Sequence, residues 1–258
     1  MLIQLTDVIK YYKGLPHQAE ALKYLQENID PYILGEFSKK FRSTSLPDGV
    51  VKTPDNTPLS RVLTRLTELG IKLTKPTKGY NAYVIGLEGC NSDFSVSNDA
   101  LDGWNDAVGV LCIDSNGTVK LSQLFQGTTE PGRYYVQNRL NPEGAAVALI
   151  DYLHKDIWVR GAHKDQQNCL IQEGAKISVI RDGNGNGRRD ASEPIRTGFF
   201  GINMHHTKGN YDIKSIGRWS AGCTVIPNVQ QHQYIMSIVN KAENKKISYI
   251  LLDRSKIK

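Results

Sequence analysis

From residue 80 onward the chain consists of short runs rich in β-branched and aromatic residues, separated by Gly, Pro, Asn and Asp. Runs of this length and composition indicate strands, because helices need longer periodic segments. The stretch Asp114-Ser115-Asn116-Gly117 between two of them predicts a hairpin turn. We therefore expect an α+β fold in which a small helical domain precedes a mostly β, sandwich or barrel-like domain. The expected strands are Tyr80–Leu87, Val108–Ile113, Thr118–Phe125, Arg133–Gln137, Ile157–Arg160, Lys176–Ile180, Arg196–Met204 and Ile247–Leu252.

The first part of the chain shows helical spacing instead. Within residues 5–43, apolar residues from Ala19 to Ile29 recur at the spacing of one helix face. A turn-rich stretch over residues 44–58 leads to a helix at Leu59–Leu69, which Gly70 ends. A last helix is expected at Val229–Ala242. We divide the chain into a helical module for targeting or substrate docking (1–43), a linker with one helix (44–79) and the main domain (80–258).

Composition narrows the class of partner without naming one. The 258 residues are 40% hydrophobic, which suits one medium domain and one small domain. Lys and Arg number 32 against 26 Asp and Glu, so the net charge is +6. That excess favours an anionic partner such as a cell-wall polymer, and ordinary surface charge explains it equally well. No basic run is long enough for a nucleic-acid-binding arm, so we expect no nucleic-acid partner.

Other sequence features concern location and redox chemistry. No apolar stretch is long enough to cross a membrane, and the Met1–Asp7 start lacks the charge pattern of a signal peptide. The four cysteines contain no C-x-x-C pair, which disfavours zinc and thioredoxin-type sites. We expect a monomer with no membrane span.

Cys223 is the strongest candidate for chemistry. It follows Ser220-Ala221-Gly222, small residues that leave room for a substrate carbonyl and expose N–H groups that can hold an oxyanion. His205 lies upstream, with fourteen residues between it and Ser220. A thiol needs a nearby base or cation to act as a nucleophile, so the sequence predicts a pair of nucleophile Cys223 and base His205.

This pattern resembles the signature of the L,D-transpeptidase catalytic domain, a histidine followed after fourteen to seventeen residues by Ser/Thr-x-Gly-Cys. Upstream, Thr128-Thr129-Glu130-Pro131-Gly132-Arg133-Tyr134-Tyr135 resembles the Thr-Pro-x-Gly-x-Tyr turn and strand of that family. The resemblance covers roughly residues 80–253. The gap length favours His205 over His206 as the base, and adjacent residues on a strand face opposite sides.

The resemblance implies a peptidoglycan-acting cysteine enzyme. Cys223 would form a thioester with a stem peptide, His205 would be the base, and N–H groups near Gly222 and Cys223, after Ser220, would hold the oxyanion. Transfer to water gives L,D-carboxypeptidase or endopeptidase activity, and transfer to an amine gives transpeptidation. The chemistry needs no cofactor. The site of action would be the bacterial cell wall, reached by an unknown export route or by release on lysis as for endolysins.

The chain departs from the family pattern at two positions. Ala221 replaces a frequent His, and Val225 replaces an Arg or Asn that can help to anchor a substrate carboxylate. Arg218 is the expected substitute for that anchor. The other expected substrate-binding residues are Trp219, His163 and Tyr134. The same departures support an alternative, a catalytically inactive cell-wall-binding module.

Residues 182–193 match a calcium-binding loop. Side-chain oxygens fall at the usual positions, and Gly187 stands at the sharp turn. The competing interpretation is a Gly/Asn-rich hairpin between strands. A calcium ion here would be structural, and a calcium-stabilised adhesion domain is a third reading of the chain. The expected ligand positions are Asp182, Asn184, Asn186, Arg188 (through its carbonyl), Asp190 and Glu193.

Overall fold

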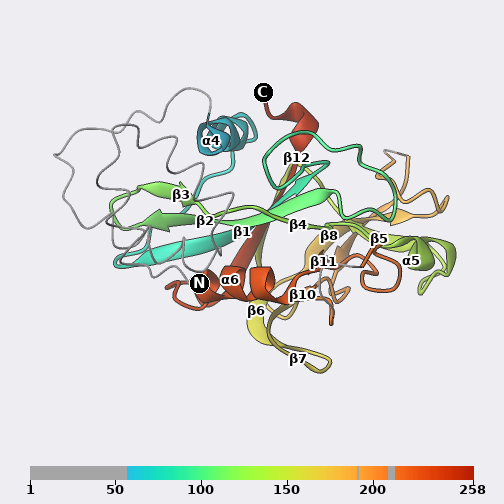
Figure 1. The fold of residues 1–258 in the computed structure, drawn as a ribbon. Helices are drawn as coiled ribbons and strands as arrows, with labels where there is room; N and C mark the ends of the chain where they lie inside the picture. Colours follow the sequence, from blue (N-terminus) through green and yellow to red (C-terminus); the bar gives the residue numbers. More distant parts are fainter. Residues whose placement is uncertain (1–56, 191, 209–212) are drawn as a thin grey trace, which may run out of the picture. The chain divides into compact units, whose positions relative to one another are not determined.

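The computed structural model describes residues 57–190, 192–208 and 213–258 (Figure 1). The helices expected within residues 1–43, and most of the turn-rich stretch at 44–58, lie outside the described residues. The described part belongs to one compact unit, Thr53–Lys258. It has a mostly β, α+β fold with a large mixed sheet and a small three-stranded sheet.

Helix α4 (Pro58–Glu68) confirms the helix predicted before the β domain. The Thr57 side chain caps its first turn by accepting the Ser60 N–H, and Gly70 follows its end at a φ of +69°. Val62 and Leu66 are buried against the sheet residues Ile85 and Leu87. This helix therefore packs as part of the β domain's own core.

The strands follow the predicted order with several additions. β1, β2, β8 and β12 match predicted segments closely, and the Asp114–Gly117 hairpin is confirmed by the antiparallel β2–β3 pair. The strands are β1 (Tyr80–Glu88), β2 (Asp106–Asp114), β3 (Val119–Leu121), β4 (Phe125–Gly127), β5 (Ala145–Ala148), β6 (Tyr152–His163), β7 (Gln166–Ile171), β8 (Ile177–Asp182), β9 (Ile195–Gly198), β10 (Met204–His206), β11 (Thr224–Ile226) and β12 (Ile247–Asp253).

Hydrogen bonding orders the large sheet as β11-β10-β7-β6-β12-β1-β2-β3, with β4 also paired to β2. The pairs β1–β12 and β10–β11 are parallel, and β5, β8 and β9 form the small sheet. Just after β4, Thr128 and Val225 exchange two backbone hydrogen bonds of 2.9 Å. Following the paired strands from β11 to β2, and then through β4 to Thr128, therefore leads back to β11. The large sheet closes on itself at this point.

Two hydrophobic clusters lie on opposite faces of the central strands. Along β12, Tyr249 and Leu251 belong to one cluster, while Ile250 and Leu252 belong to the other. The first cluster also takes the buried face of α6 (Val229–Val239) and the fully buried Trp158. Burial on both faces explains why the sequence of this strand reads as a continuous apolar run.

Three segments differ from the prediction. Arg133–Gln137, predicted as a strand, is the short helix α5: Gly132 donates to the Ser220 carbonyl, and its own carbonyl then accepts the Tyr135 and Val136 N–H groups. The strand predicted at Thr118–Phe125 is two strands, β3 and β4, because the backbone is irregular around Ser122. The strand predicted at Arg196–Met204 is likewise divided into β9 and β10.

The division between β9 and β10 has a clear cause. The Gln172 side chain accepts the N–H groups of Phe200 and Ile202, which takes the place of a strand partner. The strands β5, β7 and β11 and the 3₁₀ turn η1 (Arg254–Lys256) were not predicted. Helix α6 confirms the helix expected at Val229–Ala242, with a shorter C-terminal end.

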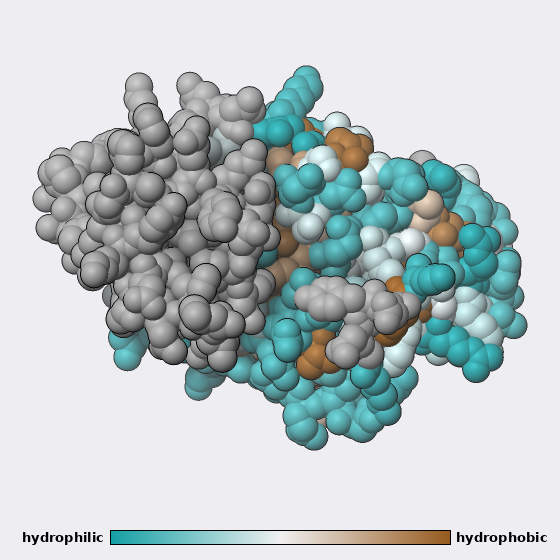
Figure 2. All heavy atoms as spheres, in the orientation of Figure 1, coloured by the Kyte–Doolittle hydropathy of each residue, from teal (hydrophilic) through white to brown (hydrophobic). Residues whose placement is uncertain are grey.

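The described surface in Figure 2 is mostly hydrophilic, with small separate hydrophobic patches. Each helix in the described part of the chain is too short or too polar to cross a membrane.

Candidate functional site

The predicted base His205 lies on β10, and the predicted nucleophile Cys223 directly precedes the neighbouring strand β11. β10 and β11 run in parallel with His205 opposite Val225, and the Thr224 N–H donates to the Asn203 carbonyl at 2.9 Å (Figure 1). This pairing continues back to Cys223. Since residues two positions apart on a strand face the same side, Cys223 and His205 lie on the same side of the two strands.

The turn before Cys223 is held by Ser220. Its buried hydroxyl donates to the Cys223 carbonyl at 2.8 Å and accepts the Gly222 N–H at 3.1 Å. Gly222 has a φ of +126°, and a Cβ there would lie 2.2 Å from the Ala146 carbonyl oxygen. Ser220 and Gly222 thus shape the turn, and the Gly222 N–H is already used within it. The Cys223 N–H has no acceptor among the described residues.

The Cys223 thiol is nearly buried, with 8% of the residue exposed. Its Sγ donates to the Gly201 carbonyl at 3.4 Å and accepts the Asn203 N–H at 3.4 Å. Burial raises the pKa of the Cys223 thiol, while the Asn203 N–H and the charge of Lys164 act in the opposite direction. The resting state is therefore a protonated thiol, which needs a base to remove its proton.

His205 has the tautomer that a base requires. Its Nδ1 lies 3.0 Å from the His206 carbonyl oxygen, which can only accept, so Nδ1 carries the proton and Nε2 keeps its lone pair. Burial lowers the pKa of His205 to about 4, so the ring is neutral at pH 7. The neighbouring His206 turns to the other side and meets the His232 ring of α6. The role of His205 as the base stays a prediction.

His163, at the end of β6, joins the same site. Its ring stacks on His205 with 4.4 Å between ring centroids. The Asn203 side chain donates to His163 Nδ1 at 2.9 Å. Asn203 thus touches both Cys223 and His163, yet the sequence analysis did not select it. Its position two residues before His205 was the available signal, because it places Asn203 on the same face of the strand.

The other predicted substrate-binding residues lie beside the turn. The Arg218 guanidinium sits over the Tyr134 ring, 3.9 Å from its centroid. Tyr134 lies in helix α5, which begins just after Gly132. The Gly132 N–H donates to the Ser220 carbonyl at 2.9 Å. Trp219 is partly buried next to Ser220. Arg218 and Tyr134 are therefore in contact with each other beside the turn that precedes Cys223, and the exposed Arg218 is open to a ligand.

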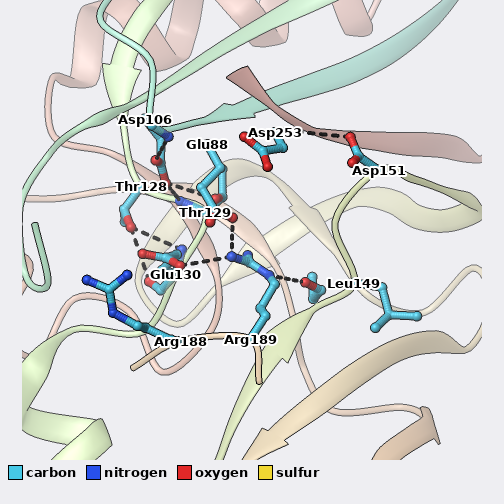
Figure 3. A network of polar contacts seen from close by, with 12 residues as sticks. Glu88, Asp106, Thr128, Thr129, Glu130, Leu149, Asp151, Arg188, Arg189 and Asp253 are labelled. Carbon is cyan, nitrogen blue, oxygen red and sulfur yellow. Dashed lines mark hydrogen bonds and ion pairs between the residues drawn. The ribbon is translucent and has the colours of Figure 1, made fainter. Parts of the chain in front are cut away.

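A buried ionic network supports the segment that lies against the turn (Figure 3). Asp106 accepts the N–H and hydroxyl of Thr129 at 2.6 and 2.8 Å. Arg189 pairs with Glu88 and, at 2.9 Å, with Glu130, and its Nε donates to the Ala148 carbonyl. These contacts hold Thr129 and Glu130, the two residues that follow Thr128, and Thr128 itself pairs with Val225.

The network holds more carboxylates than cations. Glu88, Glu130 and Asp106 surround the single Arg189 guanidinium, whose Nη2 is buried without a hydrogen-bond partner. Burial raises the pKa of Glu130 to about 7, and the charge of Arg189 only partly offsets this rise. Burial raises the pKa of Glu88 and Asp106 as well. The cluster therefore retains at least one proton near neutral pH.

A cavity of about 340 Å³ adjoins this network rather than the thiol. Glu88, Glu130, Arg188 and Arg189 are among its lining residues, and neither Cys223 nor His205 is.

The predicted calcium loop is closed by its own hydrogen bonds. Asp182 accepts backbone N–H groups from Gly185, Asn186 and Gly187. The side-chain amides of Asn184 and Asn186 both donate to Asp190, Glu193 accepts the Asn184 N–H, and the Arg188 N–H donates to Asn186. Across the described ranges, no three His, Cys, Asp or Glu residues are grouped so that they could hold a metal ion. Calcium binding here stays a prediction.

Comparisons with known protein families, with curated proteins and with solved structures find no match to this chain.

The turn geometry predicts the effect of Gly222→Ala. The added methyl meets the Ala146 carbonyl and forces an unfavourable φ, so unfolding should become easier by about 3 kcal/mol or more. Gly70→Ala is the matched control, since Gly70 also has positive φ but open space around it, and it should cost about 1 kcal/mol. Urea denaturation measures both. Equal losses in the two variants would contradict the close approach at Gly222.

The ionic network predicts a pH-dependent stability. A carboxyl whose pKa rises on folding stabilises the protein below its unfolded pKa, and this contribution is lost as the pH rises through the folded value, about 7 for Glu130. The free energy of unfolding should therefore fall as the pH rises from about 5 to about 7, by roughly 1 kcal/mol per pH unit. Glu130→Gln should flatten this slope.

Glu143→Gln is the control for that measurement, because Arg196 lowers the pKa of Glu143 and its titration lies below this range. Denaturant titrations at several pH values compare the slopes. A Glu130→Gln protein that keeps the full wild-type slope would show that Glu130 is ionised throughout.

Proposed function

We propose that residues 80–258 form a cysteine enzyme of the L,D-transpeptidase type that acts on peptidoglycan stem peptides. The observation that carries the proposal is the continuous contact from the Cys223 thiol through Asn203 to the stacked His163 and His205 rings. The histidine and Ser-x-Gly-Cys signature supplies the family resemblance. A sheet joined at its ends is consistent with the barrel-like fold expected of that family.

In the proposed reaction, His205 Nε2 takes the thiol proton as Cys223 Sγ attacks a peptide carbonyl. The C–S bond forms, and the carbonyl π electrons move to the oxygen. When this intermediate collapses, the C–N bond breaks and the His205 imidazolium returns its proton to the leaving nitrogen. The product is a thioester on Cys223, which water or an amine then resolves.

The electrostatics support proton transfer during the attack rather than a stored thiolate. The raised pKa of Cys223 and the lowered pKa of His205 both favour the neutral thiol and neutral imidazole before the substrate binds. Neutral partners avoid the desolvation cost of holding a thiolate and an imidazolium in a buried site before the substrate binds. The role of His205 is therefore that of a general base in the proposed transition state.

A catalytically inactive wall-binding module is the second candidate. The near burial of Cys223 and the replacements at Ala221 and Val225 favour it. Arg218 over Tyr134 then forms the binding surface instead of a substrate grip. The two candidates differ in one observable, the formation of a thioester at Cys223.

The nucleophile is tested by incubating the full chain with muropeptides and measuring intact mass and product masses. The wild-type protein should gain an acyl adduct on Cys223, and Cys223→Ala should lose product formation by at least about 10⁴-fold. Cys112→Ala, which removes a partly exposed thiol far from β10 and β11, should behave as wild type. Binding to peptidoglycan without any adduct or product would support the inactive module. Product masses also separate hydrolysis from cross-linking.

The pH dependence tests the base. His205 can act as the base only when its ring is neutral. The value of kcat/KM should therefore fall on the acidic side of the pH profile with a midpoint near pH 4, because burial lowers the pKa of His205 to about 4. An ordinary histidine would place this loss near pH 6.5. His205→Ala should lower the rate by about 10²–10⁴-fold across the range. A midpoint at pH 6 or above would contradict a buried neutral base.

A further inference from the structure

The two stacked histidines are held in opposite tautomers. The Asn203 amide orientation is fixed, because its Oδ1 accepts the main-chain N–H of Gln172 at 2.8 Å. Its Nδ2 therefore faces His163 and donates to His163 Nδ1 at 2.9 Å. A neutral imidazole that accepts at Nδ1 carries its proton on Nε2. His205 shows the reverse arrangement, with its proton on Nδ1 facing the His206 carbonyl.

The proposed reaction needs hydrogen-bond donors for the oxygen that becomes negative. The Gly222 N–H is already donated to Ser220, which leaves the N–H of Cys223 itself as the unused main-chain donor of this turn. One donor is fewer than such sites generally provide. His163 is half-buried, so its Nε2–H can reach an entering substrate. Asn203 connects His163 to the sulfur, because its side chain donates to His163 Nδ1 and its main-chain N–H donates to Cys223 Sγ.

We propose that the Nε2–H of His163 donates a hydrogen bond to the oxygen of the substrate carbonyl while Cys223 attacks it. This inference rests on the proposed function. His205 accepts the thiol proton, His163 stabilises the charge that develops on the oxygen, and Asn203 sets the tautomer of His163. No proton leaves His163 in this step, so the balance of the reaction is unchanged. With their opposite tautomers, the two stacked rings provide one acceptor, Nε2 of His205, and one donor, Nε2–H of His163.

Two reactions of the same thiol separate the roles. Attack on a peptide carbonyl creates an oxyanion, whereas alkylation by iodoacetamide creates none, although both need the thiol proton removed. His163→Phe keeps an aromatic ring against His205 but removes the donor. It should slow thioester formation from a muropeptide by about 10²–10³-fold, the effect of losing one such donor. The rate of Cys223 alkylation should change by less than about threefold, which is small beside the loss expected for thioester formation.

The control variant is His205→Ala, which should slow both reactions because it removes the base. Equal slowing of both reactions in His163→Phe would overturn the inference, since His163 would then act through the thiol. Unchanged thioester formation in His163→Phe would overturn it as well. If wild-type protein forms no thioester at all, the proposed function itself fails, a different result from an active wild type with an unaffected variant.

The tautomers are tested without any substrate. Long-range ¹H–¹⁵N correlation on the full chain at pH 7, with the His163→Phe and His205→Ala spectra for assignment, reports which nitrogen of each ring carries the proton. We expect Nε2–H for His163 and Nδ1–H for His205. A proton on Nδ1 of His163 would overturn the inference, because its Nε2 would then be an acceptor.

Discussion

The pair of backbone hydrogen bonds between Thr128 and Val225 is the contact on which the candidate site depends. β11 has only three residues and would otherwise be an edge strand bonded on one side alone. With Thr128 on one side and β10 on the other, its backbone is paired on both edges, so the residue before it, Cys223, is held in a defined position. The same contact joins the ends of the large sheet. The position of the candidate nucleophile Cys223 thus depends on this backbone pairing together with the Ser220 hydroxyl, which bonds the Cys223 carbonyl.

Burial favours the uncharged forms of titratable groups in two regions of the structure. Around Arg189 it leaves an excess of carboxylates that keep a proton, which costs stability as the pH rises but fixes the segment carrying Thr128 and Thr129. Around Cys223 burial keeps both the thiol and the His205 ring neutral. Low exposure therefore does not by itself argue against chemistry at Cys223. In the proposed reaction, charge would appear only when the substrate is present and donors such as His163 can meet it.

Much of the fold could be predicted from local pattern, and the failures have a common cause. The long strands β1, β2 and β12 carry enough apolar residues to be recognised alone. The three-residue strands β10 and β11 exist because distant segments pair with them, and no window of sequence contains that information. The helical turn at Arg133–Gln137 overrode the strand preference of its Tyr and Val residues, because Gly132 is bonded to Ser220. Asn203 was overlooked since an Asn near a strand has no distinctive spacing.

By itself the sequence determined a mostly β chain, a helix at Pro58–Glu68, and a histidine and a cysteine spaced as in a known signature. These properties depend on residue type and on short-range periodicity. Only the tertiary structure decided that Asn203 contacts both Cys223 and His163, that His163 stacks on His205, and which nitrogen of each ring carries a proton. A tautomer is set by the partner that the other nitrogen finds. For His163 that partner, Asn203, is forty residues away in the chain and adjacent only after the strands have paired.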